Sequence, residues 1–237
     1  MPVNRNIQKN HLFDEEEVRR TLEVLVPRGS IIEIRVLDGV LKGQNPNFTN
    51  TYSGYFDNSD CVITALHTLD SVLGIYVTMN PVNQELLSRS YNNLRKNINM
   101  TSDKDIVGRT RLLVDIDPLR ASGTSATDAA KAKAKIVARD IFNHLKGTNW
   151  TTPICADSGN GVHMIFPINL PTNDGGKVQA TLEALARQFD TPEVKIDTVV
   201  YNPARIVRLY GTRACKGDEI PHFGIYHRMS HIIRGVE

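Results

Sequence analysis

Two periodicities of apolar residues divide the chain into expected strands and helices. Over 30–37, SIIEIRVL, apolar side chains alternate with charged ones, which is typical of a strand. Asp14 is a good N-cap, and three glutamates follow it ahead of apolar positions at helical spacing, so a helix is expected from Asp14 to the PRG sequence at 27–29. The same criteria predict the other elements: strands over 74–79, 111–117, 193–197 and 204–211, a strand–turn–strand over 154–168, and helices over about 81–98, 128–147 and 175–189.

The arrangement of these elements predicts the fold class. Strands and helices alternate along the chain, which indicates a mixed α/β or α+β fold. The segment 42–60 is rich in Asn, Thr, Ser and Gly, so a long loop or a hairpin is expected there. No repeat or shift of composition marks a boundary, so we expect one domain over 1–237, with an N-terminal part of about 1–105 and a core of about 106–237 that carries the candidate site. Two expected helices have apolar faces made of Leu87, Tyr91, Leu94 and Ile98, and of Ile136, Val137, Ile141 and Leu145.

Composition narrows the class of protein. The chain is 41% hydrophobic and 23% charged with a formal net charge of +2, so any binding of nucleic acid must come from a local patch. The three cysteines are far apart and form no CxxC motif, so neither a structural zinc site nor a disulfide framework is expected. The first ten residues have no apolar signal core, and no apolar run approaches the roughly 18 residues of a membrane span. We therefore expect a cytoplasmic protein with no membrane partner.

The first stretch that suggests chemistry is RLLVDIDPLR, residues 111–120. Residues i and i+2 of a strand point the same way, roughly 6 to 7 Å apart, so Asp115 and Asp117 share one face. Two converging carboxylates are natural ligands for a hard divalent cation such as Mg²⁺, together with phosphate oxygens. The structural alternative is that these aspartates cap the next turn or pair with arginines.

The second stretch is DSGNGVHMIFPI, residues 157–168. Gly159 and Gly161 suit a tight turn between strands that leaves backbone N–H groups free. Ser158 and His163 then flank a common spot, and amides, a hydroxyl and an imidazole together suit a phosphate. The alternative is an ordinary hairpin with a surface serine and a histidine whose hydrogen bonds are made within the protein.

The third stretch, 193–217, supplies a further carboxylate and a set of cations. Asp197 ends a short alternating strand, and Arg205, Arg208, Arg213 and Lys216 follow. From 201 to 237 there are six Lys or Arg against three Asp or Glu, so this part alone carries +3. Such a patch suits a triphosphate beside metal, although a solvated basic C-terminal part is the simpler interpretation.

Together the three stretches resemble the archaeo-eukaryotic primase superfamily. Their motif sequences resemble still more closely those of the primase-polymerases of phages, plasmids and mobile elements. That resemblance rests on IEIR, SGYF, YVTMNP, DIDP, SGNGVH, NPARIVRLYGT and KGD, which occur in this order between about Ile32 and Arg228. It implies an α+β primase-polymerase core, an RRM-like mixed sheet flanked by helices, with an N-terminal α/β elaboration.

The resemblance also implies an activity. Asp115, Asp117 and Asp197 would hold two Mg²⁺ or Mn²⁺ ions in a DNA primase or DNA polymerase that joins a 3′-hydroxyl to an incoming nucleoside triphosphate. The implied partners are nucleoside triphosphates and a single-stranded or primed DNA template, with a helicase or accessory domain as a further candidate. The residues implied to hold the nucleotide are Ser158, the turn amides near Gly159, His163, Arg208 and Lys216.

One motif of the family is stretched here. A compact Pro-His-Arg unit is replaced by PHFGIYHR, so His222 or His227 could take its place, and we favour His227 with Arg228 as nucleotide-binding residues. Arg35, Tyr76 and Asn80 also recur in the pattern and have either a role in the nucleotide or template groove or an ordinary role in the fold.

Four other functions compete with this interpretation. A DxD glycosyltransferase that binds Mn²⁺ and a nucleotide sugar explains Asp115 and Asp117 but not Asp197, and a metal-dependent nuclease does not explain the basic patch. A relaxase would need a pair of metal-binding histidines that is missing from the sequence. A catalytically weak primase-like module that binds nucleotide or single-stranded DNA stays open.

Overall fold

The computed structural model describes residues 12–233. The expected lack of a signal core concerns residues 1–10, which lie outside this range. The first of two large sheets has the strand order β10-β4-β1-β2-β5, with β3 beside β1. Its strands are β1 (Ile32–Leu41), β2 (Asn50–Phe56), β3 (Leu69–Ser71), β4 (Gly74–Thr78), β5 (Arg95–Lys96) and β10 (Ile206–Arg208).

The second large sheet has the order β13-β7-β8-β6-β9, and a separate two-stranded sheet pairs β11 with β12. All strand pairs within these sheets are antiparallel. The strands are β6 (Arg109–Pro118), β7 (Ile154–Asp157), β8 (Val162–Leu170), β9 (Val194–Ile196), β11 (Arg213–Ala214), β12 (Arg228–Met229) and β13 (His231–Ile232).

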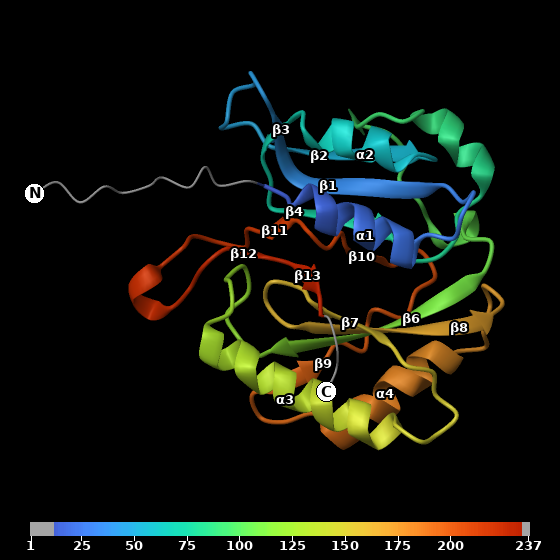
Figure 1. The fold of residues 1–237 in the computed structure, drawn as a ribbon, viewed down its shortest axis with the longest axis vertical. Helices are drawn as coiled ribbons and strands as arrows, with labels where there is room; N and C mark the ends of the chain where they lie inside the picture. The colour runs from blue at the N-terminus through green and yellow to red at the C-terminus, as the bar shows by residue number, and fades with distance from the viewer. Residues whose placement is uncertain (1–11, 234–237) are drawn as a thin grey trace, which may run out of the picture.

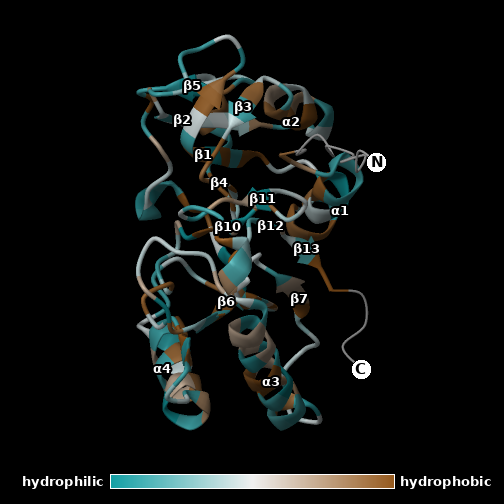
Figure 2. Cartoon of the chain, turned by 90° about the vertical axis from the view of Figure 1, so that its left-hand side faces the viewer, coloured by the Kyte–Doolittle hydropathy of each residue, from teal (hydrophilic) through white to brown (hydrophobic). Residues whose placement is uncertain are grey.

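Helices cover the outer faces of these sheets. The helices are α1 (Glu15–Leu25), α2 (Ser59–Leu66), α3 (Asp128–Leu145) and α4 (Lys177–Phe189), with 3₁₀ turns η1 (Gln84–Arg89), η2 (Asp103–Asp105) and η3 (Pro221–Phe223). In Figure 1, α3 and α4 lie below the second sheet, and α1 and α2 lie beside the strands of the first sheet. Figure 2 shows apolar and polar residues on both α3 and α4, as expected for helices that bury one face. The mixed α+β fold class is confirmed.

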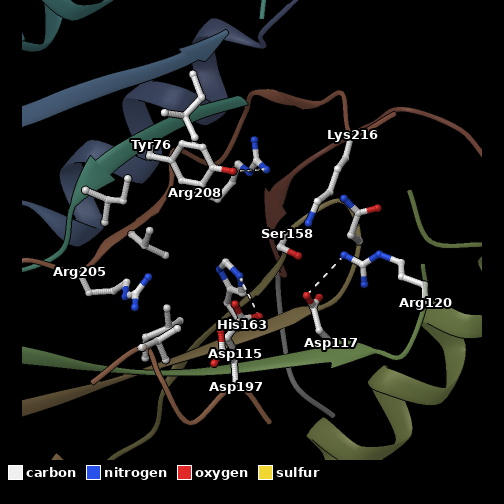
Figure 3. A pocket seen from close by; sticks show the side chains of 16 residues that line it. Tyr76, Asp115, Asp117, Arg120, Ser158, His163, Asp197, Arg205, Arg208 and Lys216 are labelled. Atoms are coloured by element: carbon white, nitrogen blue, oxygen red, sulfur yellow. Dashed lines mark hydrogen bonds and ion pairs between the residues drawn. The ribbon is translucent and has the colours of Figure 1, made fainter. Parts of the chain in front are cut away.

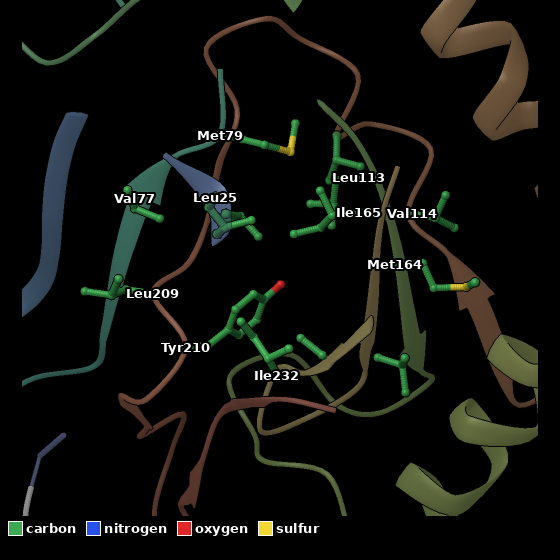
Figure 4. Packing of buried hydrophobic residues seen from close by; sticks show 14 of the residues in the cluster. Leu25, Val77, Met79, Leu113, Val114, Met164, Ile165, Leu209, Tyr210 and Ile232 are labelled. Atoms are coloured by element: carbon green, nitrogen blue, oxygen red, sulfur yellow. The ribbon is translucent and has the colours of Figure 1, made fainter. Parts of the chain in front are cut away.

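The two sheets share one buried apolar core. One cluster of buried apolar residues includes Ile34 and Ile75 of the first sheet and Met164 and Ile165 of the second. Tyr210 and its neighbours fill the space between them (Figure 4). Because β10 comes from the last third of the chain and pairs with β4, the expected parts 1–105 and 106–237 are interleaved in the first sheet. The single-domain organisation stays a prediction.

Most expected elements are confirmed, and one is wrong. The helix expected over about 81–98 is replaced by η1, a turn and β5. Asn92 and Asn97 adopt left-handed backbone conformations, with φ of 50° and 61°, which interrupt any helix. Tyr91, expected on the apolar face, is 66% exposed.

Two smaller differences concern the helices. The segment 42–60 forms the expected hairpin between β1 and β2, but α2 begins at Ser59, capped by the Asn58 side chain, and was not expected. In α3, Ile136 is 49% exposed, whereas Ala134 and Ala138 are buried beside Val137 and Ile141. Among the described residues, no helix has the length and apolarity needed to cross a bilayer.

Candidate active site

A cavity of about 310 Å³ lies between the two sheets. Its lower wall in Figure 3 comes from β6, β8 and the residue after β9, and it carries Asp115, Asp117, His163 and Asp197. Its upper wall comes from β1, β4 and β10, and there Arg208 faces the carboxylates from across the cavity. Most of the residues predicted from sequence line this one space: Asp115, Asp117, Ser158, His163, Asp197, Arg208 and Lys216.

Strand register explains why the three carboxylates meet. Asp115 and Asp117 are two residues apart on β6, so their side chains share a face. The backbone N–H of Asp197 donates a 2.8 Å hydrogen bond to the carbonyl oxygen of Asp115, which continues the antiparallel pairing of Ile116 with Ile196 by one residue. Directly opposite residues in antiparallel strands have side chains on the same face, so Asp197 joins the other two.

The two carboxyl groups on β6 differ in the direction in which their pKa values are shifted. Burial alone would raise the pKa of Asp115, but His163 and the charges of Arg120 and Arg205 hold it below the ordinary 3.8. Burial and the neighbouring charge of Asp115 raise the pKa of Asp117. Within this coupled pair, Asp115 is therefore the more acidic carboxyl group.

Arg120 neutralises part of this charge. Its Nη2 lies 3.4 Å from Oδ2 of Asp117, and two backbone carbonyls, of Pro118 and Thr124, each accept a 3.0 Å hydrogen bond from the guanidinium. The alternative that these aspartates pair with arginine is therefore correct for Asp117. Sequence analysis gave Arg120 no role, although it follows the DIDP motif by two residues.

The turn between β7 and β8 is as tight as expected, but its amides are not free. Gly159 has φ of +92°, a conformation that favours glycine. Its N–H donates to the Asp157 carboxylate at 2.8 Å, and the N–H of Gly161 donates to Oγ of Ser158 at 2.9 Å. The expectation of free amides is therefore wrong for these two groups, and Gly159 does not line the cavity. The Ser158 hydroxyl keeps its own hydrogen to donate.

Neighbouring side chains hold this turn in place. The Asp157 carboxylate forms a 2.9 Å ion pair with Lys131 of α3. The Asn160 side chain, which lines the cavity and was not singled out from sequence, accepts a 2.8 Å hydrogen bond from the N–H of Ala126. The SGNG sequence in which Asn160 lies could have marked it as a residue of the site.

His163 makes contacts on both sides of its ring. Its Nδ1 lies 2.8 Å from the hydroxyl of Tyr210, and its Nε2 lies 3.4 Å from Oδ1 of Asp115. That oxygen is buried and accepts no aligned hydrogen bond. The alternative of a histidine hydrogen-bonded within the protein therefore holds for Nδ1 alone, and the expected contact with a phosphate stays a prediction.

Arg208 lines the cavity on the wall opposite the carboxylates. Its guanidinium carbon lies 4.5 Å from the centre of the Tyr76 ring, and its Nη2 donates to the Tyr76 hydroxyl at 3.1 Å. The residue is only 8% exposed, and its Nη1 is buried without a hydrogen-bond partner. Gly74 makes room for it, because a Cβ there would lie 2.4 Å from Nη1. A buried unpaired guanidinium N–H is a donor suited to an anion.

Two expected nucleotide-binding residues lie outside this cavity. Nε2 of His227 is 2.7 Å from the carbonyl oxygen of Gly217. The Arg228 guanidinium pairs with Asp128 at 2.8 Å and donates to a backbone carbonyl of the 126–128 segment. These contacts direct the Arg228 side chain toward the start of α3 and the His227 ring toward the loop that follows β11. The alternative His222 lies in η3 against the Phe223 ring, at 4.3 Å between centroids, and does not line the cavity either.

The remaining residues of the sequence pattern have roles in the fold. Arg35 donates to Glu33 through two hydrogen bonds of 2.8 and 2.9 Å. The Asn80 side chain accepts from the backbone N–H groups of 110 and 111 and donates to a carbonyl at 203. Tyr76 lines the cavity through its contact with Arg208, which favours the groove interpretation for this residue alone.

The fit of a divalent cation can be judged from the donor set. Three carboxylates on one wall, with one buried oxygen that lacks a hydrogen bond, are suitable ligands for a hard cation. The three carboxylates are not yet close enough together to coordinate one ion. Within residues 12–233, no group of three His, Cys, Asp or Glu side chains has the spacing of a metal site. Arg120 supplies a counter-charge to Asp117, and the His163 ring lies against Asp115.

A second, more open cavity of about 490 Å³ adjoins the first. Both cavities share Asp117, Arg120, Asp197 and Lys216, so two of the three carboxylates, Asp117 and Asp197, lie on the boundary between the two spaces. This arrangement can accommodate two ligands that meet at the carboxylates.

Comparison with known proteins finds similarity among solved structures only. No protein-family profile matches the chain, and no curated protein matches it. Among solved structures, the chain is similar to the AEP domain of the primase-polymerase of cyanophage S-2L, with 12% sequence identity and a TM-score of 0.48. The superposition covers 94% of this chain and 91% of that one. A similarity at this level carries no conclusion about function, so the function proposed next depends on the site's own residues.

Proposed function

We propose that this protein is a template-directed nucleotidyl transferase, a DNA primase or polymerase that joins a 3′-hydroxyl to the α-phosphate of a nucleoside triphosphate and releases pyrophosphate. One observation carries the proposal. Asp115, Asp117 and Asp197 form one wall of a cavity whose opposite wall carries the guanidinium group of Arg208. Such a site combines ligands for cations with a donor for phosphate oxygens.

The proposal includes metal ions, with the carboxylates as their ligands. Asp115, Asp117 and Asp197 would hold two Mg²⁺ or Mn²⁺ ions. When bound, these ions supply Lewis acidity that lowers the pKa of an attacking hydroxyl and neutralises the triphosphate and the leaving pyrophosphate.

The protein's own residues bind and orient the nucleotide. Arg208 and Lys216 reach the cavity from different segments and neutralise phosphate charge. The Ser158 hydroxyl, held by the Gly161 amide, donates into the same space. Phosphoryl transfer depends on positioning and electrostatics, so the site needs no covalent nucleophile.

Two other candidates explain less of the site. A nucleotide-sugar transferase accounts for Asp115 and Asp117 but gives Asp197 no role, although its backbone is hydrogen-bonded to that of Asp115. A binding module without activity would not require three carboxylates on one wall. The adjoining second cavity also favours a reaction between two substrates.

The direct test is nucleotide incorporation. The protein is mixed with a primed DNA template, labelled deoxy- or ribonucleoside triphosphates in separate reactions, and Mg²⁺ or Mn²⁺. We expect metal-dependent extension by the wild type and its loss in Asp117→Asn. The matched control is Asp140→Asn, which changes an exposed carboxylate on α3, away from the cavity. Extension by Asp117→Asn at the wild-type rate, or none by the wild type, would contradict the proposal.

A further inference from the structure

We infer that Arg120 is a catalytic residue of the proposed transferase, and that its guanidinium binds a non-bridging oxygen of the phosphate that is transferred. This inference rests on the proposed function. In that reaction, a bond forms between the 3′-oxygen and the α-phosphorus, and the bond from that phosphorus to the oxygen that bridges it to the β-phosphate breaks. The electron pair of the broken bond leaves with pyrophosphate, the hydroxyl proton passes to water, and Arg120 keeps its own protons throughout.

Arg120 lies where the two cavities meet. It lines the cavity of about 310 Å³ and the adjoining cavity of about 490 Å³, whereas Arg208 lines the first alone and Lys195 the second alone. Figure 3 shows its guanidinium directed toward Asp117. When one cavity takes the nucleotide and the other takes the strand that carries the 3′-hydroxyl, the two substrates meet at the α-phosphorus. A cation at the boundary is therefore placed beside the group that is transferred.

Backbone carbonyl groups fix the guanidinium in this position. Its Nε donates to the carbonyl oxygen of Thr124 and its Nη1 to that of Pro118, both at 3.0 Å. The contact of Nη2 with Oδ2 of Asp117 is longer, at 3.4 Å. Because the two carbonyl contacts do not depend on Asp117, the guanidinium stays at the boundary of the cavities when that carboxylate receives a ligand.

The guanidinium also has hydrogens to offer a ligand. It carries five N–H groups, and the three contacts with Thr124, Pro118 and Asp117 use three of them. One hydrogen on each Nη atom is left, and no acceptor within residues 12–233 takes it. A planar and permanently charged donor suits phosphate oxygens. Held in place beforehand, it stabilises a transferring phosphoryl group without rearrangement at the moment of reaction.

The first test measures nucleotide incorporation by Arg120→Lys, which keeps the charge but not the planar fork, and by Arg120→Gln. Both should lower kcat at least about 100-fold while KM for the nucleoside triphosphate changes less than about threefold, because the contact acts on the group that reacts. The matched control is Arg187→Gln, which changes an exposed arginine of α4 and should keep the wild-type kcat. Circular dichroism checks the folding of each variant, and Arg120→Lys decides if Arg120→Gln does not fold. Retention of kcat, or a rise in KM alone, would overturn the inference.

The second test identifies the atom that is contacted. The two diastereomers of a nucleoside α-thiotriphosphate replace one or the other non-bridging oxygen of the α-phosphate by sulfur, which is a weaker acceptor of hydrogen bonds. The ratio of kcat/KM for the two diastereomers should differ at least about tenfold between the wild type and Arg120→Lys, and should be the same in the wild type and Arg187→Gln. An unchanged ratio in Arg120→Lys would overturn the inference, because a defect confined to the fold does not distinguish the two oxygens.

The binding of Mn²⁺ separates this role from the support of Asp117. Arg120→Gln removes a cation beside a carboxylate, so its affinity for Mn²⁺, measured from the electron paramagnetic resonance signal of the free ion, should equal or exceed that of the wild type. A loss of Mn²⁺ binding in parallel with kcat would show that Arg120 only positions Asp117, and would overturn the inference. If the wild type incorporates no nucleotide, the proposed function fails and this inference with it. An active wild type with equally active Arg120 variants overturns the inference alone.

Discussion

Asp197 donates its backbone N–H to the carbonyl oxygen of Asp115 across 2.8 Å, although 82 positions separate the two residues in the chain (197 − 115). This hydrogen bond aligns the end of β9 with the middle of β6. Antiparallel alignment then places both side chains on the wall of the cavity. The carboxylate contributed by a distant strand is therefore fixed by the backbone of the sheet.

This relationship predicts the effect of Asp197→Asn. The backbone hydrogen bond does not involve the side chain, and an asparagine Oδ1 can still accept from the N–H of Val199, as Asp197 does at 2.9 Å. We expect a folded protein with an unchanged melting temperature, and incorporation reduced at least about 100-fold through the lost charge. Circular dichroism and primer extension measure the two quantities. A melting temperature lowered in proportion to activity would indicate a structural role instead.

Gly74→Ala should disturb nucleotide binding without disturbing the fold. The new Cβ would lie 2.4 Å from Nη1 of Arg208, and the tip of a flexible side chain can move away at little cost. We expect KM for the nucleoside triphosphate to rise about tenfold, as expected for a lost charge-assisted hydrogen bond of about 1.5 kcal/mol. Steady-state kinetics at fixed primer concentration measure this change.

Gly108→Ala is the matched control for that prediction. A Cβ at Gly108 meets no atom within 4 Å, and its backbone does not adopt the left-handed conformation. Equal KM values for the two variants would show that Arg208 does not contact the nucleotide.

Glu33 should make stability depend on pH. It is fully buried, and although burial alone would raise its pKa, hydrogen bonds from Arg35 and Ser53 lower the pKa below its ordinary 4.5. A carboxyl group with a lowered folded-state pKa stabilises the fold fully above pH 4.5, and this contribution is lost as the pH falls through the folded-state value. Urea unfolding of the wild type below pH 4.5 should therefore show a falling free energy of unfolding.

The variant Glu33→Gln isolates this contribution. It should lower the free energy of unfolding by about 3 kcal/mol at pH 7, because Arg35 loses its buried partner, and should flatten the pH dependence below pH 4.5. Glu16→Gln changes an exposed glutamate of α1 and serves as the control. If both variants kept the wild-type pH dependence, Glu33 would not be its source.

Sequence reasoning identified the parts of the site that local rules determine. The i, i+2 rule placed Asp115 and Asp117 on one face, and the glycines of 157–161 indicated the tight turn. The end of the strand at 193–197 was enough to single out Asp197. The cavity brings these three stretches together.

The rest depends on tertiary contacts that periodicity does not encode. Strand alternation placed Glu33 opposite the apolar face, but the N–H of Thr101 reaches it from 68 residues away, and the carboxylate is fully buried. The apolar spacing of 81–98 matched a helix, yet left-handed Asn92 and Asn97 prevent one. Arg228 was grouped with the nucleotide-binding residues through the family's Pro-His-Arg motif, whereas its partner is Asp128.

The most direct test of the central claim is the binding of Mn²⁺ in the presence of a non-hydrolysable nucleoside triphosphate, measured from the electron paramagnetic resonance signal of free Mn²⁺. The wild type is predicted to bind two ions per chain. Asp115→Asn, Asp117→Asn and Asp197→Asn should each weaken binding at least about tenfold, and Asp140→Asn should not. Wild-type affinity in all three site variants, with nucleotide bound, would contradict the claim that these carboxylates jointly receive the cations.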